Sequence, residues 1–169
     1  MLVEQDARRD DAIEEHTNIN SRRTLDSPEQ SLGRESALVK LLQSCRTSAK
    51  AGQWAEVEKI AASAAATYPE EAFFYTQWAW ALHQLGSSAQ GISLLEKIAD
   101  RFPRSVAFAY TLACLNGARR RVFRAKLWLD LAIQQASNPD KVKLRSLVQP
   151  ELQCVWNDEC HREDLRVLR

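Results

Sequence analysis

Two glycine–proline pairs recur along this chain at one fixed interval. When the chain is shifted against itself by 34 positions, Gly52 falls on Gly86 and Pro69 on Pro103, and each glycine precedes its proline by 17 positions. Apolar residues with helical spacing follow each glycine. They are Trp54, Val57, Ile60, Ala61 and Ala64 in the first copy and Ile92, Leu95, Ile98 and Ala99 in the second. Such self-similarity predicts an array of repeated units, each too small to bury its apolar face alone.

A third copy keeps the apolar spacing but lacks the glycine and the proline at the expected positions. Arg120 stands where the glycine would fall, and the proline is displaced to Pro139. The apolar residues that keep the register are Leu112, Ala113, Ala125, Leu129 and Ala132. Only 5 glycines and 5 prolines occur among 169 residues, which favours helices over strands and turns. We therefore predict an all-α protein.

Six helices are expected from these patterns. Their predicted ranges are 37–50, 54–68, 71–85, 88–101, 105–117 and 121–136. A seventh helix is predicted in the segment DKVKLRSLV after Pro139. It would cover the apolar face that the third copy leaves open, because a repeat array needs a cap at its end.

The period and its punctuation resemble the tetratricopeptide repeat (TPR), in which two antiparallel helices share about 34 residues. The match covers three repeats, at about 38–71, 72–105 and 106–139. The resemblance implies an α-α superhelix of about three TPR helix hairpins plus a C-terminal capping helix. It also implies close helix contacts at small or fitted side chains. These are Cys45, Ala79 and Ala113 in the first helices and Val57, Gly91 and Ala125 in the second helices.

The C-terminal third resembles the end-of-group TPR module that closes many short bacterial TPR proteins. The matching residues are Leu112-Ala113-Cys114, Ala125, Trp128-Leu129, Ala132-Ile133, Lys143-Leu144 and Gln149-Pro150-Glu151-Leu152 with Trp156. The module usually reads Asp-Pro-Asp-Leu where this chain has Gln-Pro-Glu-Leu. The resemblance implies that residues 140–169 form a capping helix and a tail, and it carries no chemistry.

The N-terminal residues differ in composition from the repeats. Residues 1–35 carry many charges and few apolar anchors, so we expect a mostly disordered arm before the three repeats of residues 36–139. Ser27 and Pro28 predict a helix start, with Ser27 as the cap and Pro28 at the first helical position.

The absence of targeting signals and the balanced net charge limit the classes of partner that we expect. The sequence has no apolar stretch of the length that a signal peptide or a membrane span needs, so we expect a cytoplasmic protein without a membrane partner. Its 23 basic and 22 acidic side chains give a net charge of +1. Such a balance provides no broad positive field, so no nucleic-acid partner is expected.

Motifs for catalysis are missing from the sequence. It contains no phosphate-binding glycine loop and no nucleophile elbow, so we expect neither an enzyme nor a cofactor. Cys154, Cys160 and His161 are the best metal candidates, but their C-x5-C-H spacing lacks the close cysteine pair of zinc sites, and no metal is expected. Cys114 and His83 are the best candidates for a thiolate pair, yet a packed thiol beside a solvated imidazole is the favoured interpretation.

The strongest local charge is the basic run of Arg119, Arg120 and Arg121, continued by Arg124 and Lys126. We interpret it as a solvated turn between helices. The alternative is a contact with an acidic partner, for which Asp10-Asp11 and Glu14-Glu15 of the same chain are candidates.

The TPR resemblance implies a concave groove formed by the first helix of each pair. The family register places nine predicted peptide-binding residues there. They are Gln43, Arg46, Phe73, Gln77, Trp80, His83, Tyr110, Thr111 and Cys114. Aromatic anchors beside amide and cationic donors suit an extended or helical peptide. Occupation of the groove by the N-terminal arm remains the alternative.

Chaperone-tail TPR domains clamp a terminal carboxylate with lysine, asparagine and arginine side chains. At those positions this chain has Val39, Gln43, Gln77, Ala107 and Thr111, so a more apolar ligand is expected.

The predicted function is therefore a non-enzymatic protein–protein interaction module, an adaptor or scaffold that binds a partner's peptide segment. Two alternatives remain. One is a chaperone like the TPR chaperones of type III secretion, which keep an apolar client in solution. The other is a structural subunit that self-assembles into a homo-oligomer.

Overall fold

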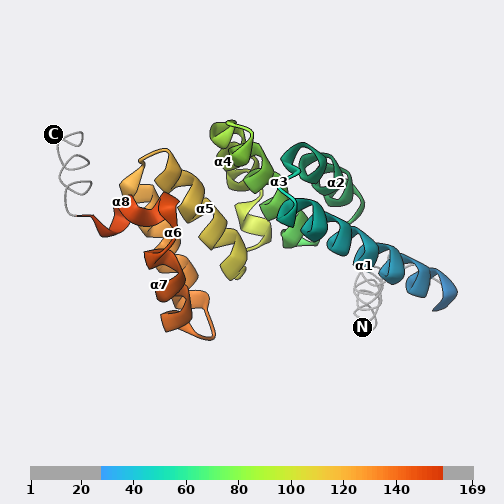
Figure 1. The fold of residues 1–169 in the computed structure, drawn as a ribbon. Coiled ribbons are helices and arrows are strands. Elements are labelled where there is room, and N and C mark those ends of the chain that lie inside the picture. Colours follow the sequence, from blue (N-terminus) through green and yellow to red (C-terminus); the bar gives the residue numbers. More distant parts are fainter. Residues whose placement is uncertain (1–27, 158–169) are drawn as a thin grey trace, which may run out of the picture. The chain divides into compact units, whose positions relative to one another are not determined.

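The computed structural model describes residues 28–157, with side chains for residues 32–157. It is all-α, and no strand occurs in this part of the chain. The elements are α1 (Pro28–Lys50), α2 (Trp54–Thr67), α3 (Ala72–Gln84), α4 (Ser88–Glu96), η1 (Ala99–Arg101), α5 (Val106–Ala118), α6 (Val122–Gln135), α7 (Pro139–Leu147), η2 (Pro150–Leu152) and α8 (Gln153–Trp156) (Figure 1). The chain divides into two units after Ala37, inside α1, and the helix hairpins belong to the second unit.

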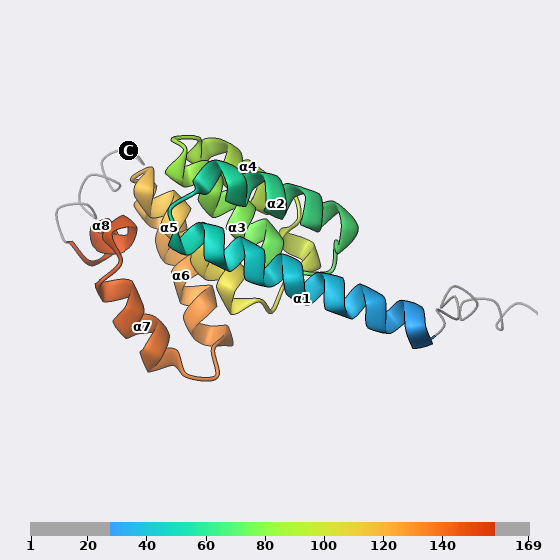
Figure 2. The same cartoon turned by 45° about the vertical axis from the view of Figure 1, so that its right-hand side comes forward.

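Within the second unit the helices pair in chain order. The C-terminal part of α1 packs on α2 through Cys45, Val57 and Ala61, while α3 pairs with α4 and α5 with α6. Consecutive hairpins stack because α2 contacts α3, and α3 and α4 both contact α5 (Figure 2). The helix α7 packs on α6, as the predicted cap should. The superhelix of three hairpins with a capping helix is thus confirmed.

The tight helix contacts lie at the predicted small or fitted positions. Cys45, Ala79 and Ala113 are fully buried. At Gly91 an added Cβ would lie 2.7 Å from the carbonyl oxygen of Ala79, a distance that real Cβ atoms do not show. The backbones of α3 and α4 therefore approach so closely that glycine is required at position 91.

The turn inside each hairpin uses one residue with positive φ. Gly52 has φ 70° and Gly86 has φ 85°, and Arg120 takes the same role in the third hairpin with φ 55°. The shared turn geometry explains why the sequence period persists without its third glycine. It also places an arginine in a left-handed conformation that disfavours a Cβ atom.

We expect Arg120→Gly to stabilise the protein by about 1 kcal/mol, because glycine adopts the left-handed region without the steric cost. Urea unfolding followed by circular dichroism measures the change in midpoint. The reverse substitution, Gly86→Arg, is the matched control and should destabilise by a similar amount, since no atom lies within 4 Å of a Cβ placed there. A lowered midpoint for Arg120→Gly would show that the contacts of the arginine side chain stabilise the protein by more than its left-handed backbone conformation destabilises it.

Two helices differ from their predicted ranges. The first begins at Pro28 instead of residue 37, in agreement with the Ser27-Pro28 start signal; Ser27 itself lies outside the described residues. The fourth ends at Glu96 and not at residue 101. There Ile98 leaves helical geometry with φ −119°, and this break brings Phe102 against the core, 5.5 Å from the ring of Phe108.

The segment after α7 docks on α5. Leu152 is fully buried and Val155 nearly so, in one cluster with Ala109 and Ala113. A Cβ at Gly117 would overlap the carbonyl oxygen of Glu151. This segment is therefore an integral part of the second unit's core.

Candidate functional site

A partly enclosed pocket of about 210 Å³ lies between α3, α5 and α7. Its lining residues are Trp54, Thr76, Gln77, Trp80, Tyr110, Thr111, Cys114, Arg145 and Gln149. The volume suits one bulky side chain and not a drug-sized ligand, for which pockets usually exceed about 300 Å³. The lining combines aromatic rings with amide, hydroxyl and guanidinium groups.

Five of the nine predicted groove residues meet in this pocket. They are Gln77, Trp80, Tyr110, Thr111 and Cys114. The repeat period explains part of this result, because Gln43, Gln77 and Thr111 occupy one repeat position. One further period leads to Arg145, which sequence reasoning missed because it treated the last helix only as a cap. No comparable signal pointed to Gln149.

Trp80 forms one wall of the pocket. It is partly buried, it packs against two core clusters, and its ring makes an edge contact with His83 at 5.2 Å between centroids. Trp78, two residues earlier, packs on one of the same clusters and also on the cluster that contains Cys45. The two tryptophans thus share one core cluster, and each extends to a different second cluster.

Tyr110 and Cys114 form the floor. Both are buried, and burial is the main reason that the pKa of each rises to about 12. The carboxylate of Glu151 raises both pKa values further, while the guanidinium of Arg145 lowers them. Both groups are therefore neutral at physiological pH, and the Cys114 thiol lacks the thiolate character that a nucleophile needs.

His83 lies in a polar cluster beside the pocket and does not line it. Its Nδ1 is 2.9 Å from the hydroxyl of Ser88, and its Nε2 is 3.4 Å from Oε1 of Glu151. The side chain is only 17% exposed. The expectation of a solvated imidazole is therefore wrong. The reason is tertiary: a residue 68 positions later folds back onto α3.

The three remaining predicted groove residues lie elsewhere on α1 and α3. Gln43 is exposed and does not line this pocket. Arg46 places its guanidinium carbon 5.2 Å from the ring centre of Phe73. Phe73 itself is partly buried and packs against the core. Arg46 and Phe73 thus form an arginine–aromatic pair, and neither of them lines the pocket.

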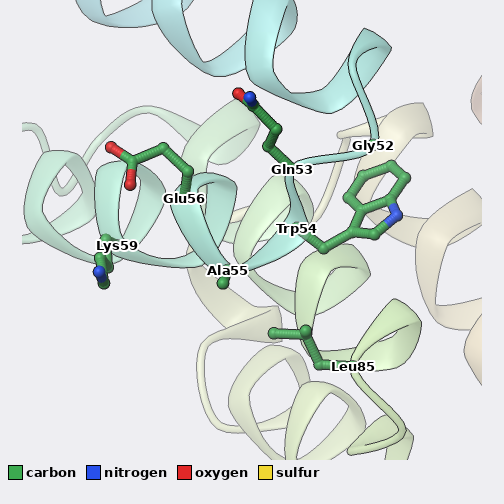
Figure 3. Close-up of a pocket in the computed structure, with 7 residues that line it drawn as sticks. All are labelled: Gly52, Gln53, Trp54, Ala55, Glu56, Lys59 and Leu85. Carbon is green, nitrogen blue, oxygen red and sulfur yellow. The ribbon is translucent and has the colours of Figure 1, made fainter.

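A second, shallow hollow of about 670 Å³ lies beside the turn between α1 and α2. Its lining residues are Gly52, Gln53, Trp54, Ala55, Glu56, Lys59 and Leu85 (Figure 3). Trp54 lines both hollows, so the two share one wall. The shared residue extends the apolar surface from the partly enclosed pocket towards the first hairpin turn.

The other chemical candidates do not assemble into a site within the described chain. Cys160 and His161 lie outside the described residues, and the Cys154 thiol contacts the carbonyl oxygen of Gly117 at 3.6 Å. Residues 32–157 contain no cluster of three histidine, cysteine or acidic side chains suited to a metal ion. No helix in the described part is long and apolar enough to cross a bilayer.

The basic run forms an exposed turn. Arg119, Arg120 and Arg121 are exposed, and Arg124 pairs with Glu96 at 2.8 Å. The structure thus places the three consecutive arginines on an exposed turn between α5 and α6. The acidic residues proposed as its partners, at positions 10, 11, 14 and 15, lie outside the described residues.

Comparisons with known proteins give a structural likeness. No protein-family model matches the chain, and no curated protein matches it in sequence. Among solved structures it resembles the Yersinia enterocolitica type III secretion chaperone SycD, crystallised in complex with a peptide of the translocator YopD. The TM-score is 0.59 at 16% identity, over 71% of this chain and 92% of that one. At this identity the likeness shows a shared helical fold.

Proposed function

We propose that this protein is a non-enzymatic, cytoplasmic interaction module that binds a peptide segment of a partner protein in a concave TPR groove. The observation that carries the proposal is the partly enclosed pocket between α3, α5 and α7, whose aromatic walls fit one bulky side chain. We assign residues 38–71, 72–105 and 106–139 to three TPR units, residues 1–35 to an N-terminal arm whose last residues already belong to α1, and residues 140–169 to a capping helix with a C-terminal tail.

The chemistry of the pocket supports binding over catalysis. Its thiol and its phenol are both neutral at physiological pH, because burial raises the pKa of each to about 12. The amide of Gln77 offers both a donor and an acceptor, and the oxygens of Thr111 and Gln149, whose own donors are used within the chain, offer acceptors to a peptide backbone. Apolar walls with a polar rim are typical of an anchor pocket at a protein interface.

We expect Trp80→Ala to weaken capture of the native partner by about 2 kcal/mol or more, as truncation of a central aromatic anchor does. The test is affinity purification from the native cell with the full chain as bait, followed by titration of the recovered partner. Because Trp80 also contacts two core clusters, circular dichroism must show that the variant remains folded.

A second variant separates binding from folding. Thr111 is a pocket residue that is only partly buried, so Thr111→Arg should fill the pocket without emptying the core. Both variants should lose the same partner, whereas Gln134→Arg, at an exposed position of α6 outside the pocket, should keep it. A folded Thr111→Arg protein that retains full affinity would refute the pocket as the anchor site.

A secretion-type chaperone is the second candidate. The shared fold with SycD favours it, since that protein was crystallised with a translocator peptide. In this role the protein would keep an apolar, membrane-inserting client in solution. Co-expression should then move such a client from the insoluble to the soluble fraction, and an unchanged distribution with all native candidate clients would exclude the role.

Self-association is the remaining alternative. Large apolar side chains are exposed on α6, on α7 and just after α7, at Phe123, Leu127, Leu144, Leu147 and Val148. Sedimentation over a range of concentrations decides between a monomeric binder and an assembly subunit. A constant monomer mass would exclude the homo-oligomer.

A further inference from the structure

Resting on the proposed function, we infer that the groove selects acidic peptide segments, in which a leucine or aromatic side chain has an aspartate or glutamate close by in the sequence. The apolar side chain enters the pocket, and the carboxylate pairs with Arg145 at the rim. The inference rests on where the groove arginines lie and on the absence of carboxylate partners for them within the described chain.

Arg145 is the one charged group in the pocket lining, among the residues that the structure describes. Its guanidinium carbon lies 4.9 Å from the ring centre of Tyr110, a cation–π contact that holds the side chain over the ring of this pocket residue. The residue is exposed, and among residues 32–157 no carboxylate oxygen lies within ion-pair distance of it. The hydrogen-bond donors of its planar guanidinium therefore remain available to a ligand carboxylate.

The nearby carboxylate of Glu151 does not satisfy Arg145. Its Oε1 faces Nε2 of His83 at 3.4 Å, and its Oε2 accepts a hydrogen bond from Nε2 of Gln149. The groups packed around the pocket floor, Tyr110 and Cys114, carry no charge at physiological pH. The carboxylate of Glu151 is thus engaged by neighbouring side chains, and the guanidinium of Arg145 is the charged group that a ligand in the pocket would meet.

Arg46 repeats this arrangement on α1. It is exposed, it lies over the ring of Phe73, and it too has no ion pair in the described part of the chain. Arg101 also lies over aromatic rings, those of Tyr75 and Phe102, but its guanidinium donates hydrogen bonds to the carbonyl oxygen of Pro69 and the hydroxyl of Tyr75. Arg46 and Arg145 have neither such a hydrogen bond nor a carboxylate partner within the described chain, so their charges are available to complement an acidic ligand.

The experiment is a selection of random dodecapeptides displayed on phage against the full-length protein. We expect enrichment of peptides with an acidic residue within three positions of a leucine or aromatic residue. Synthetic versions of the enriched peptides should lose about tenfold in affinity when Arg145 is changed to Gln, as expected for loss of a charge-assisted hydrogen bond. Lys141→Gln removes one charge from an exposed position of the same helix outside the pocket and should leave the affinity unchanged.

A charge reversal makes the test specific. Selection against Arg145→Glu should replace the acidic residues of the enriched peptides with lysine or arginine. Enriched peptides that lack an acidic preference, or that bind Arg145→Gln as tightly as the parent, would overturn the inference; if their binding is still lost in Thr111→Arg, the proposed groove function stands. A selection that enriches no common sequence overturns both.

Discussion

Replacing Gly117 by alanine is expected to destabilise the protein by about 3 kcal/mol, the upper end of the usual cost of overpacking a core. The added Cβ would overlap the carbonyl oxygen of Glu151, and it would lie 3.1 Å from the carbonyl carbon of that residue. Backbone atoms cannot rotate away as a flexible side chain can. Either α5 or the segment after α7 must therefore move, and the buried side chains of Leu152 and Val155 lose their fitted contacts.

Urea unfolding with circular dichroism and tryptophan fluorescence measures this effect. Gly33→Ala is the matched control, because nothing lies within 4 Å of a Cβ placed at that position in α1. That control should be neutral or stabilising by up to about 1 kcal/mol, since alanine is the better helix former. If Gly117→Ala is as stable as the parent, the C-terminal segment is not docked on α5 as described.

Gly117→Ala should also disturb the pocket. The same segment carries Gln149, which lines the pocket, and Glu151, which contacts His83 on α3. Displacing it therefore breaks the polar cluster and removes one wall. The capping segment thus contributes to the proposed ligand site as well as to stability.

The second large effect is expected for Phe108→Ala, which should cost about 3–5 kcal/mol, as truncation of a buried phenylalanine usually does. Phe108 is 2% exposed and lies 5.5 Å from the ring of Phe102 and in one cluster with Leu95 and Leu112. This cluster joins α5 to the preceding hairpin. The loss should therefore lower the unfolding midpoint of all helices together and leave no separate transition for the third hairpin.

Phe123→Ala provides the control of the same residue type. Its side chain is 67% exposed on α6, so its truncation should change the free energy of unfolding by less than about 1 kcal/mol. Equal effects at positions 108 and 123 would contradict the assignment of the core to the inner helix faces. Two separate unfolding transitions in Phe108→Ala would show that the stacked hairpins are not cooperatively coupled.

The local helix pattern was accessible from the sequence because it depends on short-range spacing. The repeat period and its apolar pattern located five of the helices to within one residue at each end, from α2 to α7 with the exception of α4. The pattern wrongly extended α4 beyond Glu96. There the helix breaks, and the packing of Phe102 against Phe108 takes precedence over the helical spacing of residues 97–101. The pattern also underestimated the length of α1, because the first turns of this helix are polar and lack the apolar spacing of the other helices.

The candidate site was only partly accessible. The repeat register brought Gln77, Trp80, Tyr110, Thr111 and Cys114 to one place, and the structure gathers those five in the pocket. It did not reveal that Phe73 packs into the core or that His83 meets Glu151. Contacts of this kind join residues from different helices, and no spacing rule encodes them.

The sequence by itself thus determined the helices, the hairpin turns and the order of stacking, because each depends on a pattern within one repeat or on the period between neighbours. Only the tertiary structure decided that Arg145 of α7 lies over the ring of Tyr110 and that Glu151 contacts His83 and Gln149. The physical reason is that the chain folds back after α7, and the close approach at Gly117 fixes where its side chains meet α3 and α5.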